Sequence, residues 1–103
     1  MQRLQTAVDL HNQGDLEKAE EIYREVLAVD TNNFYALNFC GRIQNQKRNY
    51  AEGICLLRRA VDLQPNNPDV NYNLGRIYQN AQRRVEAIRS YQKAINLQHN
   101  FSE

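Results

Sequence analysis

The sequence has few of the residues on which small secreted domains and membrane proteins depend. It contains 2 cysteines, 2 prolines, 4 glycines and no tryptophan, which is too little cysteine for a disulfide framework. Its longest nearly apolar stretch, Gly53 to Leu57, is far shorter than the roughly 18 residues that a membrane-spanning helix needs. The N-terminus also lacks the basic-then-apolar pattern of a secretory signal. We therefore expect a cytoplasmic protein with no membrane segment.

Side chains that perform catalysis or bind metals are scarce as well. There are two serines and two threonines, no glycine-rich phosphate loop and no interpretable Ser/His/Asp or Cys/His set. The two histidines, His11 and His99, have no ligand partners at metal-site spacing. Cys40 and Cys55 both fall at small or apolar repeat positions, so we expect two buried, unreactive thiols. The sequence predicts no catalytic residue, no metal site and no cofactor.

The chain is rich in amide side chains and in charged residues of both signs. Asparagine and glutamine make up 23 of its 103 residues, and its 13 basic and 12 acidic residues leave a net charge of +1. Residues 1–33 carry −4, residues 34–67 carry +3 and residues 68–103 carry +2. This weak dipole can orient a charged partner, but it is far from the basicity of a dedicated nucleic-acid domain. We expect neither a nucleic acid nor a small-molecule substrate as the ligand.

The most informative feature is a repeat of 34 residues. Three sets of small or large residues recur at this step, namely Ala7, Gly41 and Gly75; Ala19, Gly53 and Ala87; and Tyr23, Leu57 and Tyr91. A fixed period of this size is typical of a solenoid built from one supersecondary unit. Because solenoids expose broad surfaces instead of enclosing a catalytic pocket, the repeat predicts a function in binding.

Within each repeat the apolar pattern predicts two helices. Apolar residues recur at three- and four-residue steps through residues 22–29, 56–63 and 88–97. Each run follows a second helical stretch, and these stretches end near Gln13, Gln46 and Asn80. The two sets of small residues let paired helices approach closely. The predicted fold is all-α, a single domain over residues 1–103 with helical hairpins at about 1–33, 34–67 and 68–101.

Residues at the expected helix ends agree with this hairpin pattern. Asp15 and Asn49 are predicted N-caps, and Glu52, three residues after Asn49, resembles the second half of a capping box. Asn67-Pro68 opens the last hairpin, with asparagine as the cap and proline at the first helical position. The left-handed residue of the turn within each hairpin falls on Gly14, Arg48 and Gln82.

The third copy carries the motif of a known family. The chain resembles the tetratricopeptide repeat at Leu74-Gly75, Tyr78, Ala87, Tyr91 and Ala94. The second copy has Gln44 where the motif has an aromatic residue, and the first has Arg3 where it has a large apolar one. This resemblance covers about residues 2–101. It implies a right-handed superhelix, or solenoid, of three antiparallel helix pairs, with a concave groove lined by the first helix of each pair.

In this family the groove commonly holds an extended peptide or a helix of a partner. The family's groove-facing pattern selects as peptide-binding residues Tyr35, Asn38, Phe39, Arg42, Asn45, Tyr72, Asn73, Arg76, Gln79 and Asn80, and in addition Leu4, Gln5, Val8, His11, Asn12, Gln46 and Asp69. Amides can pair with a peptide backbone, and aromatic rings offer apolar contact area. Arg42 and Arg76 can clamp a carboxylate or a phosphate. The expected partner is a protein or peptide, and the arginines favour an acidic one.

Two departures narrow the choice of ligand. Members of the family that hold the acidic C-terminal tails of heat-shock chaperones use a two-carboxylate clamp of Lys, Asn and Arg. The matching positions here are Leu4, Val8, Phe39, Asp69 and Asn73, so we expect no co-chaperone function. Asn73 matches the asparagine ladder of O-linked N-acetylglucosamine transferase, but Phe39 and Gln5 interrupt that ladder.

The sequence is compatible with three functions. The leading hypothesis is a protein-interaction module that binds an extended peptide or helix in its groove. The second is a substrate-recruiting or regulatory segment of a larger enzyme, such as a glycosyltransferase. The third is a self-assembly scaffold, because no polar closing helix follows Ile88, Tyr91 and Ile95 and a homo-oligomer could form through uncapped repeat ends. A plainer alternative for the groove is a soluble amide-rich face, with Arg42 and Arg76 bridging carboxylates between helices.

Overall fold

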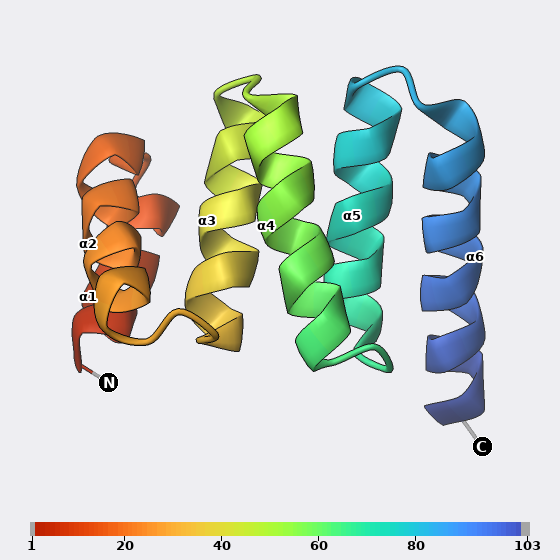
Figure 1. Ribbon diagram of the computed structural model, residues 1–103, viewed down its shortest axis with the longest axis horizontal. Coiled ribbons are helices and arrows are strands. Elements are labelled where there is room, and N and C mark those ends of the chain that lie inside the picture. Colours follow the sequence, from red (N-terminus) through yellow and green to blue (C-terminus); the bar gives the residue numbers. More distant parts are fainter. Residues whose placement is uncertain (1, 102–103) are drawn as a thin grey trace.

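The computed structural model describes the backbone of residues 2–101 and the side chains of residues 3–98. Within that range the chain forms six helices and no strand: α1 (Gln2–Asn12), α2 (Leu16–Val29), α3 (Phe34–Gln46), α4 (Tyr50–Leu63), α5 (Pro68–Asn80) and α6 (Arg84–Phe101). Consecutive helices form hairpin 1 (α1/α2), hairpin 2 (α3/α4) and hairpin 3 (α5/α6), which follow one another across the molecule (Figure 1). The predicted all-α solenoid of helix pairs is confirmed. No helix in the described range is long and apolar enough to span a bilayer.

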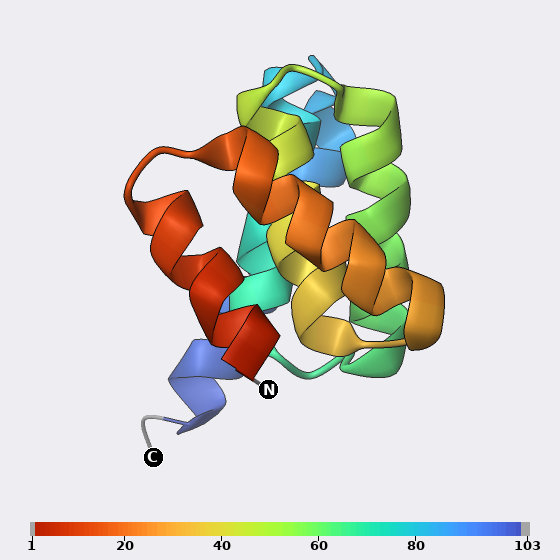
Figure 2. The ribbon, with the colours of Figure 1, turned by 90° about the vertical axis from the view of Figure 1, so that its left-hand side faces the viewer.

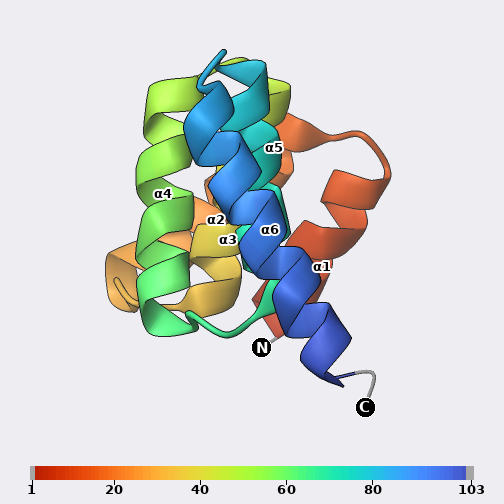
Figure 3. The same cartoon turned by 90° about the vertical axis from the view of Figure 1, so that its right-hand side faces the viewer.

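The first helices of the hairpins meet on one side of the molecule. Helix α3 packs against both α1 and α5, whereas within residues 2–101 the backbones of α2 and α4, and those of α4 and α6, do not approach each other closely. Seen from the two ends of the stack, α1 and α4 lie on opposite sides (Figures 2 and 3). Because neighbouring hairpins close toward each other on the first-helix side, that side is the inner, concave one. Helices α1, α3 and α5 therefore carry the groove.

Short side chains set the spacing of the two helices in hairpins 2 and 3. A Cβ atom at Gly41 would lie 2.6 Å from Cγ of Leu57, and one at Gly75 would lie 2.8 Å from Cδ1 of Tyr91. Both distances are below van der Waals contact, so no larger residue fits at either glycine without displacing its neighbour. The predicted close approach at these positions is confirmed.

Most of the predicted signals at the helix ends are present. Side chains of Asp15 and Asn67 accept hydrogen bonds from backbone N–H groups in the first turns of α2 and α5. The turns within the hairpins carry the expected left-handed residues, with φ of +87° at Gly14, +67° at Arg48 and +65° at Gln82. Only glycine adopts this conformation without a steric cost, so the turns at Arg48 and Gln82 are the more strained two.

The predicted cap at Asn49 is wrong. Its side chain makes no capping bond and instead donates from Nδ2 to Oε1 of Gln44, 3.1 Å away. Gln44 is fully buried and also bonds to Glu20 of α2. The capping box fails for a related reason, because the Glu52 carboxylate accepts a hydrogen bond from Arg24 of hairpin 1 at 2.8 Å. Both side chains serve a polar contact between hairpins that repeat-by-repeat reasoning does not include.

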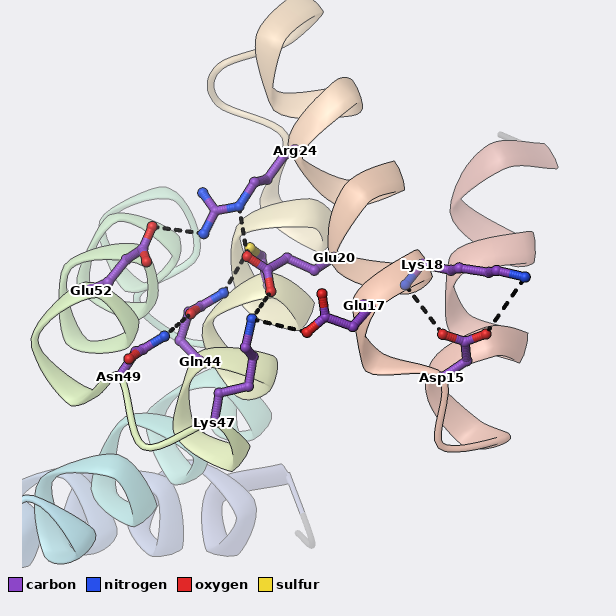
Figure 4. A network of polar contacts seen from close by, with 10 residues as sticks. Asp15, Glu17, Lys18, Glu20, Arg24, Gln44, Lys47, Asn49 and Glu52 are labelled. Carbon is purple, nitrogen blue, oxygen red and sulfur yellow. Dashed lines mark hydrogen bonds and ion pairs between the residues drawn. The ribbon is translucent and has the colours of Figure 1, made fainter.

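This contact is a network that joins hairpin 1 to hairpin 2 (Figure 4). At its centre, the Glu20 carboxylate accepts hydrogen bonds from Arg24 and from Lys47, each at 2.8 Å. Partial burial would by itself raise the pKa of the Glu20 carboxyl, but the hydrogen bonds from Lys47, Arg24 and Gln44 outweigh it and hold the pKa below its usual range. Hairpin 1 is therefore attached partly through charge.

The two thiols differ, and the prediction for one of them is wrong. Cys40 is buried in the core, and burial raises the pKa of its thiol. Cys55 is exposed. It lines an open hollow together with Leu27 and Ala28 of α2, on the outer side where the backbones of α2 and α4 stay apart. The small side chain at this repeat position faces that gap and not the core.

Candidate functional site

The residues selected as the centre of the groove all lie on α3 and α5, but their exposure differs. Arg42, Arg76, Gln79 and Asn80 are exposed, as are Tyr35 at 53% and Tyr72 at 50%; Phe39, Asn45 and Asn73 are partly buried, and Asn38 is buried. Each of them lies on the first helix of its hairpin, as expected from the sequence. Their role in binding a ligand stays a prediction.

Amide side chains on α3 pair with amide side chains on α5. Nδ2 of Asn73 donates to Oδ1 of Asn38 at 3.0 Å, and Nδ2 of Asn80 donates to Oδ1 of Asn45 at 2.8 Å. In both pairs the donor follows the acceptor by 35 residues in the sequence. Sequence reasoning treated these amides as separate ligands and missed the pairs. The signal that could have found them is the recurrence of Asn at a spacing one residue longer than the repeat.

The outer predicted residues on α1 make contacts within the protein. Leu4 packs against the core cluster, and Gln5 donates to the Asp9 carboxylate on its own helix at 3.1 Å. His11 donates from Nε2 to Oε1 of Gln46 on α3 at 2.7 Å, since an amide oxygen can only accept. The inner surface that remains most available to a ligand is therefore formed by α3 and α5.

Arg42 stands at the end of a row of aromatic rings. The rings of Tyr23 on α2 and Phe39 on α3 stack with centroids 5.7 Å apart. The guanidinium carbon of Arg42 lies 5.8 Å from the Phe39 centroid, within the range of a cation–π contact. Burial raises the pKa of Tyr23 to about 12, so this ring stays neutral. The row holds the Arg42 side chain against the inner face of α3.

Arg76 is supported in the same way from hairpin 3. The rings of Tyr91 on α6 and Tyr72 on α5 lie 5.5 Å apart, and the guanidinium carbon of Arg76 is 6.0 Å from the Tyr72 centroid. The Tyr91 hydroxyl donates to Oε1 of Gln79 at 2.8 Å. Sequence reasoning identified Tyr72 and Arg76 as groove residues but did not connect Tyr91 with the groove. Its ring in fact supports the tyrosine on which the arginine lies.

Neither groove arginine is neutralised by the rest of the described chain. The ion pairs found among residues 3–98 involve Arg3, Arg24, Arg83 and two lysines, and none includes Arg42 or Arg76. The alternative in which these two arginines bridge carboxylates between helices is therefore not seen. Both guanidinium groups keep their hydrogen-bond donors for a ligand.

A pocket of about 200 Å³ lies between the two arginines. Its lining comes from α3, α4 and α5 and consists of Arg42, Asn45, Gln46, Leu57, Asn73 and Arg76. Leu57 is fully buried and supplies the apolar part of the lining. Two positive charges, three amides and no acidic group therefore surround one hollow at the centre of the inner face.

Family models match most of the chain. Two described as "Tetratricopeptide repeat" match residues 6–29 and 68–101, and one described as "TPR repeat" matches residues 41–82. The chain belongs to the tetratricopeptide-repeat family. The resemblance stated from the sequence is thereby confirmed, and with it the assignment to a class of protein-interaction modules.

Individual relatives share the fold over nearly the whole chain. Mouse protein O-mannosyl-transferase TMTC3 is 30% identical over 88 residues, which are 85% of this chain and 10% of that protein. A mutant O-GlcNAc transferase of Thermobaculum terrenum superposes with a TM-score of 0.90 at 30% identity, over 92% of this chain and 18% of that one. The second TPR of Spaghetti (RPAP3), bound to an HSP90 peptide, shares the fold with a TM-score of 0.87 at 17% identity, covering 93% of this chain and 89% of that one. The chain thus spans about a tenth of its curated relative and under a fifth of the transferase.

Proposed function

We propose that this tetratricopeptide-repeat chain binds an extended peptide segment of a partner protein along the inner face of α3 and α5. The observation that carries the proposal is the pair of unneutralised arginines, Arg42 and Arg76, on either side of a pocket of about 200 Å³. No carboxylate among the described residues pairs with either arginine, so both can offer a ligand charge-assisted hydrogen bonds. The RPAP3 repeat, which has the same fold, was solved with a peptide bound.

The amide pairs suit recognition of a peptide backbone. Each pair uses one N–H of the α5 residue and the oxygen of the α3 residue, which leaves the amide group of Asn45 as a donor and the Oδ1 atom of Asn73 as an acceptor. Both residues line the pocket. An extended peptide presents N–H and C=O groups in alternation, so one donor and one acceptor side by side can pair with it whatever its side chains are. Asn38 is buried and acts by fixing the orientation of Asn73.

Two tyrosines supply apolar contact area beside these polar groups. Tyr35 and Tyr72 are each about half exposed, at 53% and 50%. Tyrosine is favoured at binding surfaces because it offers a large rigid surface with few rotatable bonds. In this proposal the two rings pack against side chains of the bound peptide, while the amides hold its backbone.

A display selection tests the proposal. Random dodecapeptides are selected on the intact chain, and their affinities are then measured for a Tyr35→Ala/Tyr72→Ala variant and for an Ile88→Ala/Ile95→Ala control, which truncates two exposed apolar residues of α6 outside the groove. We expect the groove variant to lose at least about tenfold in affinity, as truncation of an aromatic anchor does, and the control to keep its affinity. Equal affinities for all three proteins would show that the peptides bind elsewhere.

A second candidate function is the presentation of acceptor proteins to a glycosyltransferase. Two relatives that share 30% identity with this chain are an O-mannosyl-transferase and an O-GlcNAc transferase, and the chain matches only 10% and 18% of them. In this version the chain is a segment of a larger enzyme, and the peptide in the groove carries the hydroxyl that is modified. Selected groove peptides should then be rich in serine and threonine. A selection with no such enrichment would argue against it.

A third candidate function is self-assembly through the face of α6 that no helix covers. Ile88 and Ile95 are 49% and 62% exposed, whereas Ile54, the counterpart of Ile88 on α4, is 7% exposed beneath α5. The face that is buried in hairpin 2 is thus exposed on α6 of hairpin 3, where a second copy of the chain can cover it. Sedimentation equilibrium should show a mass that rises with concentration for the unmodified chain and a constant monomer mass for Ile88→Glu/Ile95→Glu. A constant monomer for both would eliminate this function.

A further inference from the structure

We propose that the pocket between Arg42 and Arg76 is a specificity site for one carboxylate side chain, aspartate or glutamate, of the bound peptide. This inference rests on the proposed peptide-binding function and adds what the peptide must contain. The arginines are not at the positions of the two-carboxylate clamp of the family, which are occupied here by Leu4, Val8, Phe39, Asp69 and Asn73. The pocket is therefore distinct from that clamp.

At the pocket, hairpin 2 carries shorter side chains than hairpin 3 does at the equivalent positions. Tyr23 and Tyr91 occupy this position in hairpins 1 and 3, and Leu57 occupies it in hairpin 2. In hairpin 3 the Tyr91 hydroxyl reaches Gln79 at 2.8 Å, whereas the corresponding pair in hairpin 2 is Leu57 and Asn45, both shorter. The hollow of about 200 Å³ lies beside these two shorter side chains.

The hydrogen-bond groups around this hollow are mostly donors. Arg42 and Arg76 offer guanidinium N–H groups, and the amide nitrogen of Asn45 remains because its oxygen accepts from Asn80. Gln46 likewise keeps its amide nitrogen, since its oxygen accepts from His11. Asn73 supplies its Oδ1 atom as an acceptor, while one of its two N–H groups donates to Asn38. The two positive charges and the N–H groups around them, with no carboxylate in the lining, favour an anion over a neutral amide or a cation.

The lining also distinguishes among anions. Leu57 is the apolar residue of the lining, which is compatible with the methylene groups of an aspartate or glutamate side chain. No acidic residue lines the pocket, so a bound carboxylate meets no repulsion from it. Each arginine is already held over an aromatic ring, at 5.8 Å from Phe39 and 6.0 Å from Tyr72. Little side-chain freedom is therefore lost when the anion binds.

The test compares three pools of blocked decapeptides that have random flanks free of Asp and Glu and one fixed central residue: glutamate, glutamine or phosphoserine. We expect the glutamate pool to bind the intact chain at least about tenfold more tightly than the glutamine pool, which corresponds to roughly 1.4 kcal/mol or one charge-assisted contact. The preference should fall as salt is added, because salt screens the partly exposed arginines. Equal binding of these two pools would overturn the proposal, and tightest binding of the phosphoserine pool would overturn the assignment to carboxylate.

Two variants locate the effect. Leu57→Tyr/Asn45→Gln introduces the residues of hairpin 3, which are larger and should fill the pocket while both arginines stay. Gly41 leaves space beside the new tyrosine, as Gly75 does beside Tyr91. Arg42→Gln/Arg76→Gln keeps the pocket and removes its charge, and Arg58→Gln/Arg89→Gln is the control with the same change in net charge outside the groove. The first two should lose the preference for glutamate and the control should keep it.

A preference kept by both pocket variants would overturn the site. A different result would overturn the proposed peptide-binding function. If the glutamine pool binds the intact chain and loses affinity for Tyr35→Ala/Tyr72→Ala while the glutamate pool shows no advantage, the groove is right and the carboxylate site is wrong. If no pool depends on the two tyrosines, the groove itself is wrong.

Discussion

Asn73 on α5 donates a hydrogen bond from Nδ2 to Oδ1 of Asn38 on α3, across 3.0 Å. Asn38 is buried, at 7% exposure, so this bond both satisfies a polar group inside the protein and ties two neighbouring hairpins together on the groove side. The same bond sets which atom of Asn73 faces the pocket. A single contact therefore connects the stacking of the repeats to the chemistry of the inner face.

Removing this contact should destabilise the protein. Asn38→Ala should lower the free energy of unfolding by about 1 to 3 kcal/mol, because Asn73 loses its partner and a cavity opens at a buried position. Urea unfolding followed by circular dichroism measures the change. Asn80→Ala, which breaks the exposed pair with Asn45, is the control and should cost less than about 0.5 kcal/mol, since water replaces an exposed partner. Equal losses would show that burial of Asn38 does not matter.

The contact of Gly41 with Leu57 sets the spacing of hairpin 2. A methyl group at residue 41 would lie 2.6 Å from Cγ of Leu57, so we expect Gly41→Ala to lower the free energy of unfolding by about 1 to 3 kcal/mol through overpacking. In the double variant Gly41→Ala/Leu57→Ala the clash is absent, and its loss should be smaller than the sum of the two single losses. Additive losses in urea unfolding would mean that the two residues do not meet.

The Glu20 network makes the attachment of hairpin 1 dependent on pH. The pKa of Glu20 in the folded chain is below its ordinary value of 4.5, so the stabilisation that Glu20 provides is fully present above pH 4.5 and is lost as the pH falls through the lower, folded value. Glu20→Gln should therefore be less stable than the unmodified chain at pH 7, by about 1 kcal/mol or more. The difference should shrink progressively below pH 4.5. Chemical unfolding at several pH values measures it, and a difference that does not change with pH would contradict the network.

The repeat and its helices were predictable because they depend on local patterns. The period of 34 residues, the apolar faces and the left-handed turn at Gly14 all follow from residues close together in sequence. The close approach at Gly41 and Gly75 was also predictable, since small residues recur at one position in every repeat. These features are properties of a single hairpin and of its repetition.

Contacts between hairpins were less predictable. Asn49 was expected to cap α4, but the buried Gln44 in the preceding helix takes its side chain. Cys55 was expected in the core and instead faces the outer gap between α2 and α4. In the groove, sequence reasoning identified Arg42 and Arg76 but not the hollow between them, because the hollow forms where side chains of three helices, α3, α4 and α5, meet.

The most direct test of the central claim is a map of where a bound peptide touches the protein. The backbone amide and methyl resonances of the isotopically labelled chain are followed by nuclear magnetic resonance while a selected peptide is added. We expect the largest changes on α3 and α5 around Arg42, Asn73 and Arg76, and at the methyl groups of Leu57. Changes concentrated instead on the outer side, around Cys55 and Arg59, would contradict binding in the groove.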